Sequence, residues 1–155
     1  MANTQALSNQ FRVDIMTSGF NLSTGVKTIR AALYLASGTI NATKLVYGGT
    51  IGSVADTSEA SGTGYTAGGV VVTNATSPTG ANTTPAGDAV YWTPSASIVY
   101  TGVTLTAFDT VVLFDGTTPF HAIGAWNFGS QTIVAGNVTL TMPTNNATTG
   151  LVRLL

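Results

Sequence analysis

Hydrophobic and polar residues alternate with a period of two through most of the chain after residue 20. At this spacing every second side chain lies on the same face of a β-strand. In residues 26–35 it places Ile29, Ala31, Leu33 and Leu35 on one side of a predicted strand. Further strands are predicted over residues 69–73, 89–92, 98–100, 103–107, 137–142 and 150–155. The last of these predicts a C-terminus paired into a sheet or against a partner.

A β-hairpin is predicted over residues 110–126. The strand-like residues 110–114 lead into Asp115-Gly116, and the chain returns through residues 120–126. Asp-Gly is favoured in tight turns because both residues tolerate positive φ. Residues 117–119 lengthen the loop.

Helix is scarce in the pattern. Residues 8–16 form the best window: Ser8 can cap it, and Phe11, Ile15 and Met16 fall on one side before Gly19. A second short turn is predicted over residues 41–47. The longest segment rich in helix and strand breakers, residues 73–87, is predicted to be the most exposed loop.

Many short strands with Gly and Pro between them indicate an all-β fold. We predict one β-sandwich domain over residues 1–155, of the jelly-roll type, with residues 1–20 as an N-terminal arm containing the short helix. The length of 155 residues suits one domain. No fixed repeat is visible, which argues against a propeller or a solenoid.

The composition excludes several classes of partner and chemistry. Only 7% of residues are charged, Lys+Arg 5 nearly balance Asp+Glu 6, and the mean hydropathy is +0.32. So balanced a charge disfavours nucleic acid and anionic membranes as partners. No apolar run approaches the roughly 18 residues that span a bilayer, and no basic leader is visible, so we expect the protein to be made and kept in a cytoplasm, or released by lysis. Cys 0 excludes disulfides and thiolate chemistry.

The predicted surface is nearly neutral, and its polar residues are mainly Thr, Ser, Asn and Gly. A dispersed monomer usually carries many mixed charges, since low net charge promotes association. Such a surface suits permanent contact with other protein. A compositional bias of the host toward small residues is the alternative explanation.

Acid–base catalysis has few candidate groups: Asp14, Asp56, Glu59, Asp88, Asp109, Asp115 and His121. We expect His121 to be a strand residue satisfied by local hydrogen bonds. Asp109 and Asp115 bracket a strand and are expected to shape its ends. A paired-carboxylate site remains the weaker alternative, and the sequence has no G-x-S-x-G nucleophile motif. We therefore expect no enzyme activity.

Metal and cofactor sites are not indicated. One histidine and no cysteine leave no zinc constellation, although calcium bound by loop carbonyls with Asp56 and Glu59 stays open. The glycine-rich segments do not match phosphate-binding patterns. Among the aromatic residues, Trp126 is expected in the core; stacking of Tyr65, Tyr91, Trp92 or Phe128 on sugars or bases is the alternative.

Several segments together resemble a known class of protein. These are a helical stretch at 7–16, the strand at 29–34, the glycine-rich residues 62–69, and residues 126–129 before 138–143. In this order they resemble small virion structural proteins of tailed bacteriophages, over most of the chain. Residues 62–69 are the most specific element, and the threonine-rich residues 73–87 depart from the pattern. The resemblance implies a non-enzymatic capsid decoration (cement) protein on the capsid exterior, with a jelly-roll fold.

Such a protein would bind and stabilise the lattice of the major capsid protein, repeating a modest interface many times. It would also form a homodimer or homotrimer. A tail or neck protein of the same particle is the first alternative, and a small glycan-active enzyme using Asp109, Asp115 or His121 is the remote one. The residues expected to contact partners lie at the two termini or are nearby cations: Met1, Ala2, Asn3, Thr4, Gln5, Arg12, Arg30, Leu151, Val152, Arg153, Leu154 and Leu155.

Overall fold

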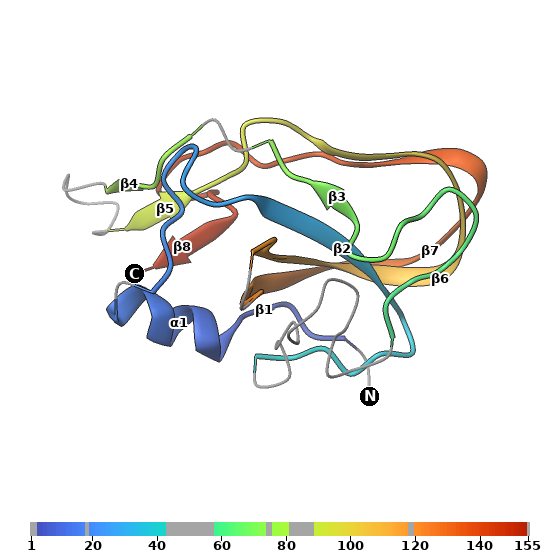
Figure 1. Cartoon of the computed structure of the whole chain (residues 1–155), viewed down its shortest axis with the longest axis horizontal. Helices are drawn as coiled ribbons and strands as arrows, with labels where there is room; N and C mark the ends of the chain where they lie inside the picture. Colours follow the sequence, from blue (N-terminus) through green and yellow to red (C-terminus); the bar gives the residue numbers. More distant parts are fainter. Residues whose placement is uncertain are drawn as a thin grey trace.

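The computed structural model describes residues 3–17, 19–42, 58–73, 76–80, 89–117 and 120–154. Within them the chain is an all-β sandwich with one short helix, as predicted (Figure 1). Its jelly-roll connectivity stays a prediction. The elements in chain order are β1 (Ala6–Leu7), α1 (Asn9–Met16), β2 (Ile29–Leu35), β3 (Val70–Val71), β4 (Thr79–Gly80), β5 (Val90–Trp92), β6 (Ile98–Asp115), β7 (Ala122–Leu140) and β8 (Val152–Leu154).

The strands form two antiparallel sheets. The larger has five strands in the order β1-β7-β6-β2-β3, and the smaller has three in the order β4-β5-β8. The predicted pairing of the C-terminus is confirmed, because β8 pairs with β5 and places Val152 opposite Trp92. No helix of the described residues has the length and apolar character to cross a membrane.

Two long strands, β6 and β7, form the centre of the larger sheet. The predicted hairpin is confirmed, with Val111 opposite Trp126 and Leu113 opposite Gly124. The strands predicted at 98–100, 103–107 and 110–114 are all parts of β6, and β7 joins 122–126 to 137–140 in the same way. Register shifts and positive φ at Gly102, Ala107, Gly129 and Ala135 interrupt the pairing without ending it. In Figure 1 the β6–β7 ribbon turns back on itself at the right of the view.

Strand β2 is buried on both faces. Ile29, Ala31 and Leu33 face one apolar cluster, which also contains Trp92 of β5 and Val152 of β8. This cluster joins the small sheet to the large one. Two further residues of β2, Ala32 and Tyr34, belong to a second cluster that includes Ile40, Val112, Phe114 and Phe120. The face predicted for Ile29, Ala31 and Leu33 is confirmed, but the opposite face is not exposed.

The predicted N-terminal helix is confirmed as α1. The Ser8 hydroxyl caps it, accepting from the backbone N–H of Gln10 at 3.1 Å and of Phe11 at 3.5 Å. The predicted apolar face is confirmed for Phe11 and Ile15, which line one pocket, but Met16 is exposed and Asp14 is buried. A carboxylate is buried here because other side chains bind it, as described below.

The glycine-rich residues 62–69 pack tightly on the large sheet. A Cβ placed on Gly62 would lie 2.0 Å from the Thr104 carbonyl oxygen of β6, so only glycine fits there. The segment leads into β3, which is shorter than the strand predicted at 69–73.

In the predicted loop at 73–87, residues 77–80 are exposed and include β4, and residues 74, 75 and 81–87 lie outside the described residues. Most of the turn predicted at 41–47 also lies outside them.

Candidate interaction surface

Asp115 closes the β6–β7 hairpin. The Lys27 Nζ lies 2.7 Å from Asp115 Oδ2, and Asp115 Oδ1 accepts from the N–H and hydroxyl of Thr117 at 3.0 and 2.6 Å. The carboxylate is buried. Asp115 therefore shapes the end of its strand, as predicted, and is fully engaged in doing so.

His121 is bound by a distant residue. Its Nδ1 lies 2.5 Å from Asp14 Oδ2, and Gln10 Nε2 donates to Asp14 Oδ1 at 2.7 Å. These contacts fasten α1 to the beginning of β7. The prediction that His121 is satisfied by hydrogen bonding agrees with this contact, but the partner is 107 residues away and not local.

Asp109 lies in a buried network of neutral donors. Its Oδ1 accepts from Asn3 Nδ2 at 2.6 Å and from the Thr110 hydroxyl at 2.7 Å, and its Oδ2 accepts from Asn127 Nδ2 at 2.9 Å. Asn3 also donates to the Leu35 carbonyl oxygen at 2.8 Å. The Asn3 side chain, predicted to contact a partner, is instead buried and holds the N-terminal arm against the sheet.

Arg30 and Glu59 both bind the glycine-rich segment. Arg30 donates to the carbonyl oxygens of Gly68 and Gly69 at 3.0 and 2.6 Å. Glu59 Oε1 accepts from the Gly68 N–H at 2.6 Å and from the Tyr65 hydroxyl at 2.8 Å. Burial, with the nearby Glu59 charge, raises the pKa of Tyr65 far above its usual value. Arg30, another predicted partner contact, thus serves the fold.

The described charged side chains are mostly used inside the molecule. Six of the eight, Asp14, Lys27, Arg30, Glu59, Asp109 and Asp115, bind groups of the same chain. Of the other two, Arg12 is exposed and Arg153 is half-buried. The described exterior therefore carries even less charge than the composition implies. Asp56 and Asp88 lie outside the described residues, so the calcium pair Asp56–Glu59 remains untested.

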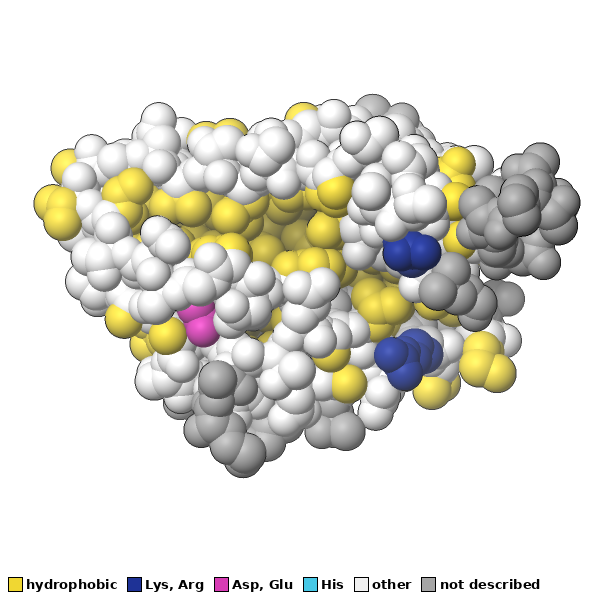
Figure 2. All heavy atoms as spheres, turned by 180° about the vertical axis from the view of Figure 1, so that it is seen from behind, with side chains coloured by type: hydrophobic (Ala, Val, Ile, Leu, Met, Phe, Trp, Pro, Cys, Tyr) yellow, Lys and Arg dark blue, Asp and Glu magenta, His cyan; other side chains and the backbone are white. Residues whose placement is uncertain are grey.

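An apolar groove, the β7 groove, lies along the inner side of the bent ribbon. It consists of two adjoining hollows of about 300 and 330 Å³ that share Phe128, Thr139 and Leu140. Figure 2 shows a long hydrophobic hollow between polar rims on the back of the molecule. None of the lining residues is charged: Ile98, Phe108, Val111, Leu113, Trp126, Asn127, Phe128, Gln131, Thr132, Ile133, Asn137, Val138, Thr139, Leu140, Thr141, Met142 and Leu151.

Trp126 lies at this groove and not in the closed core. It is half-buried and packs against the core cluster from outside, whereas Trp92 is fully buried. The groove is a site that the sequence did not predict. The sequence feature that could have indicated the groove is the alternation of polar and apolar residues at 137–142, which places Val138, Leu140 and Met142 on one half-buried face.

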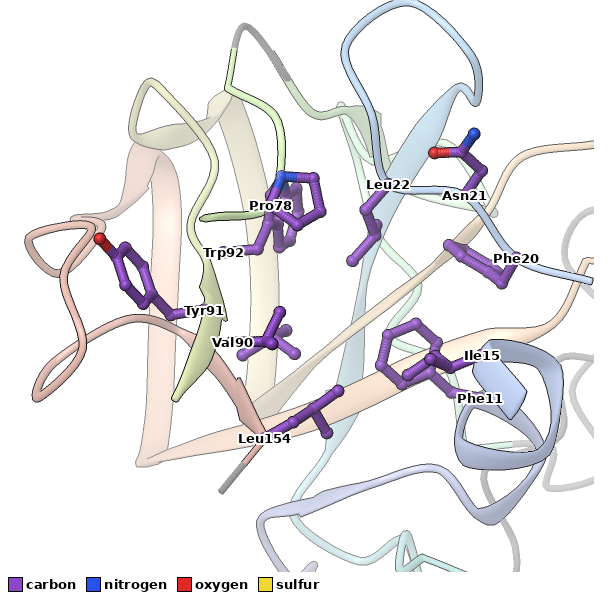
Figure 3. A pocket seen from close by; sticks show the side chains of 11 residues that line it. Phe11, Ile15, Phe20, Asn21, Leu22, Pro78, Val90, Tyr91, Trp92 and Leu154 are labelled. Atoms are coloured by element: carbon purple, nitrogen blue, oxygen red, sulfur yellow. The ribbon is translucent and has the colours of Figure 1, made fainter. Parts of the chain in front are cut away.

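A second, smaller pocket lies between α1 and the small sheet. Its volume is about 170 Å³. Phe11, Phe20 and Leu22 approach it from one side, and Trp92 and Leu154 from the other (Figure 3). Asn21 is the most polar residue of the lining. Residues of the N-terminal segment and of the C-terminal strand thus line one pocket, the helix-side pocket.

The predicted partner contacts divide between surface and interior. Thr4, Gln5 and Arg12 are exposed. Val152 is buried in the core, Leu151 lines the β7 groove, Leu154 lines the helix-side pocket and Arg153 is half-buried. Met1, Ala2 and Leu155 lie outside the described residues.

Comparison with known proteins gives no relative. No protein-family model matches the chain, and the searches of curated proteins and of solved structures find no match either. In the described part of the chain no three His, Asp or Glu side chains cluster as a metal site would require. The surface itself therefore carries the functional argument.

Proposed function

We propose that this chain is a structural protein of a bacteriophage virion, a capsid decoration protein that binds and stabilises the major capsid protein lattice from outside. The observation that carries the proposal is the charge-poor exterior, in which six of eight described ionic side chains are engaged internally. A surface of this kind suits permanent cover by protein, since interface centres are depleted of charged residues. The phage assignment itself rests on the sequence resemblance.

The N-terminal face is the proposed contact with the shell. Helix α1 exposes Val13 and Met16, which are 51% and 87% accessible, beside Arg12. Thr4 and Gln5 are exposed just before β1. An apolar residue as exposed as Met16 suits insertion into a pocket on a partner. Many copies on a lattice would make a modest contact of this kind effective.

The acidic groups and the histidine support a non-enzymatic role. The backbones of Asp115 and His121 are hydrogen-bonded to each other, but the side chains of Asp109, Asp115 and His121 belong to three separate networks. Each side chain holds parts of the fold together. A glycan-active enzyme would need such groups to converge around a substrate. Alanine substitution of each, assayed on cell-wall and capsular polysaccharides, separates the two functions: any activity that one of these changes abolishes would favour the enzyme.

Binding to the shell tests the proposal. Purified protein is titrated onto expanded capsids that lack it, from the phage that encodes it. We expect saturation at a fixed ratio to the major capsid protein, with Met16→Glu weakening binding at least about tenfold because a charge must then be desolvated. Val71→Glu, at an apolar side chain on β3 that is 59% exposed, is the control and should bind normally. Failure to saturate, or location in tail or neck rings by image reconstruction, would contradict the proposal.

A further inference from the structure

Strand β7 has an open edge. On one side it pairs with β6 along nearly its whole length, from Ala122 to Leu140. On the other side β1 pairs only with Gly124 and Ala125. From Trp126 to Leu140 no described strand lies beside the outer edge. The backbone there is available for pairing with another chain.

This edge lacks charge and proline, two of the usual protections against pairing. Natural edge strands carry charged residues or proline, are very short, or are twisted away by β-bulges. None of the residues 126–140 is Asp, Glu, Lys, Arg or Pro. The positive-φ residues Gly129 and Ala135 bend the strand but leave regular stretches at 130–134 and 136–140. The opposite edge of the same sheet, by contrast, is the two-residue strand β3.

The open edge and the β7 groove form one surface. The apolar β7 residues Phe128, Ile133 and Val138, which line the groove, are half-buried in the isolated chain. Residues from both halves of the bent strand, from 126–133 and from 137–140, line the groove, so the strand with the open edge forms both of its sides. Val134, which is 75% exposed, adds an apolar side chain to the same edge.

The absence of charge points to a second copy as the occupant. Around a two-fold axis two identical edges run antiparallel, and each side chain faces a residue of the same stretch. A charge close to that axis would therefore face its own symmetry mate, and like charges directly opposite are destabilising. A foreign partner would more often be selected by complementary charges. An edge with none across residues 126–140 meets the requirement for self-pairing.

We propose that the edge of β7 pairs antiparallel with the β7 edge of a second copy about a two-fold axis, and that this pairing covers the β7 groove. The resulting dimer is a continuous sheet across two chains. It forms in solution without a capsid, and so it does not depend on the decoration function.

Mass measurement in solution gives the first test. Light scattering coupled to gel filtration should give twice the 15.8-kDa chain mass at micromolar concentration and above. Val134→Lys and Thr139→Lys place a charge at exposed positions of the edge and should raise the dimer dissociation constant at least about tenfold. Val71→Lys, on the β3 edge, should leave it unchanged. Circular dichroism of each variant checks that the fold is intact.

Disulfide trapping gives a second test that needs no loss of stability. The chain has no cysteine, so a single Ser130→Cys, Val134→Cys or Thr139→Cys reports on one position. Mild oxidation should link copies rapidly at the position nearest the two-fold axis and slowly at the others, whereas Val71→Cys should stay unlinked. A monomer at every concentration would overturn the proposal. So would a dimer or trimer that persists in both lysine variants and is trapped no faster through the β7 positions than through Val71→Cys.

Discussion

Gly69 lies against the backbone of Ala31 so closely that a Cβ built on it would be 1.5 Å from the Ala31 carbonyl oxygen. The Gly69 φ of +61° is also in the left-handed region of backbone conformation, which residues with a side chain rarely adopt. Arg30, next to Ala31 in β2, donates to the Gly69 carbonyl oxygen. The end of the glycine-rich segment is thus fixed on β2 by sterics and by hydrogen bonding together.

Gly69→Ala should be severely destabilising. The added methyl group must displace a main-chain carbonyl, so we expect a loss of more than about 3 kcal/mol in the free energy of unfolding, or no folded protein. Gly80→Ala is the matched control, because nothing lies within 4 Å of its Cβ position. It should change stability by less than about 0.5 kcal/mol in urea unfolding. Equal stability of the two variants would show that the segment is not fixed in this way.

Asn3→Ala should measure how much the N-terminal arm contributes to the stability of the fold. Its amide donates to Asp109 and Leu35 and its Oδ1 accepts from the Ile40 N–H at 3.0 Å. Truncation leaves a buried carboxylate short of a donor, which costs about 2–3 kcal/mol, or roughly a 5–10 °C decrease in melting temperature. Thr4→Ala changes an exposed neighbour and should melt like the parent protein. A melting temperature unchanged in both variants would contradict the buried position of Asn3.

His121 variants should separate hydrogen bonding from packing. His121→Ala removes the group that binds Asp14, and we expect a loss of about 1–2 kcal/mol because the buried carboxylate keeps only Gln10. His121→Asn retains an N–H donor near the position of Nδ1 and should recover at least half of that loss. Thermal unfolding of the three proteins measures the difference. An equal loss in both variants would indicate packing alone.

Alkaline pH should unfold the protein through its buried tyrosines. Burial, with the Glu59 charge, raises the pKa of Tyr100 far above the ordinary 10.0, and Tyr65 behaves likewise. The unfolded chain therefore loses these protons near pH 10 while the folded chain keeps them. Stability is complete below that pH and falls above it, by about 1.4 kcal/mol per pH unit for each phenol.

Urea unfolding between about pH 9 and 11 measures this slope. Tyr100→Phe loses a hydrogen bond to the Ala31 carbonyl oxygen and is less stable at every pH, but its alkaline slope should be about half as steep. A slope that does not change on this substitution would mean that Tyr100 ionises normally in the folded protein.

The sequence predicted the position of an element well where one local interaction determines where that element begins or turns. Ser8 marks the beginning of α1 because its hydroxyl caps the helix within three residues. Asp115-Gly116 marks the hairpin because turn geometry is a property of the dipeptide and its neighbours. Strand β6, however, was divided into three at Gly102 and Ala107. A bulge and a turn both use positive φ, and only the partner strand distinguishes them.

The surface was harder to predict because burial depends on distant residues. Asp14 is buried by His121 and Asn3 by Asp109, more than 100 residues away in each pair. No period in the sequence contains that information. The β7 groove escaped prediction for the same reason: Trp126 and Met142 line one hollow only because the ribbon folds back on itself.

The central position of the β6–β7 ribbon also bears on how the protein can be made. Strand β2 has its longest partner in β6, and β1 has its partner in β7, so the first third of the chain cannot complete its pairing while residues 98–140 are still missing. During synthesis β2 can pair with β3 early, but it must wait for Asp115 to complete its pairing, and β1 must wait for Ala125. Folding of this protein is thus a late event that follows translation of most of the message.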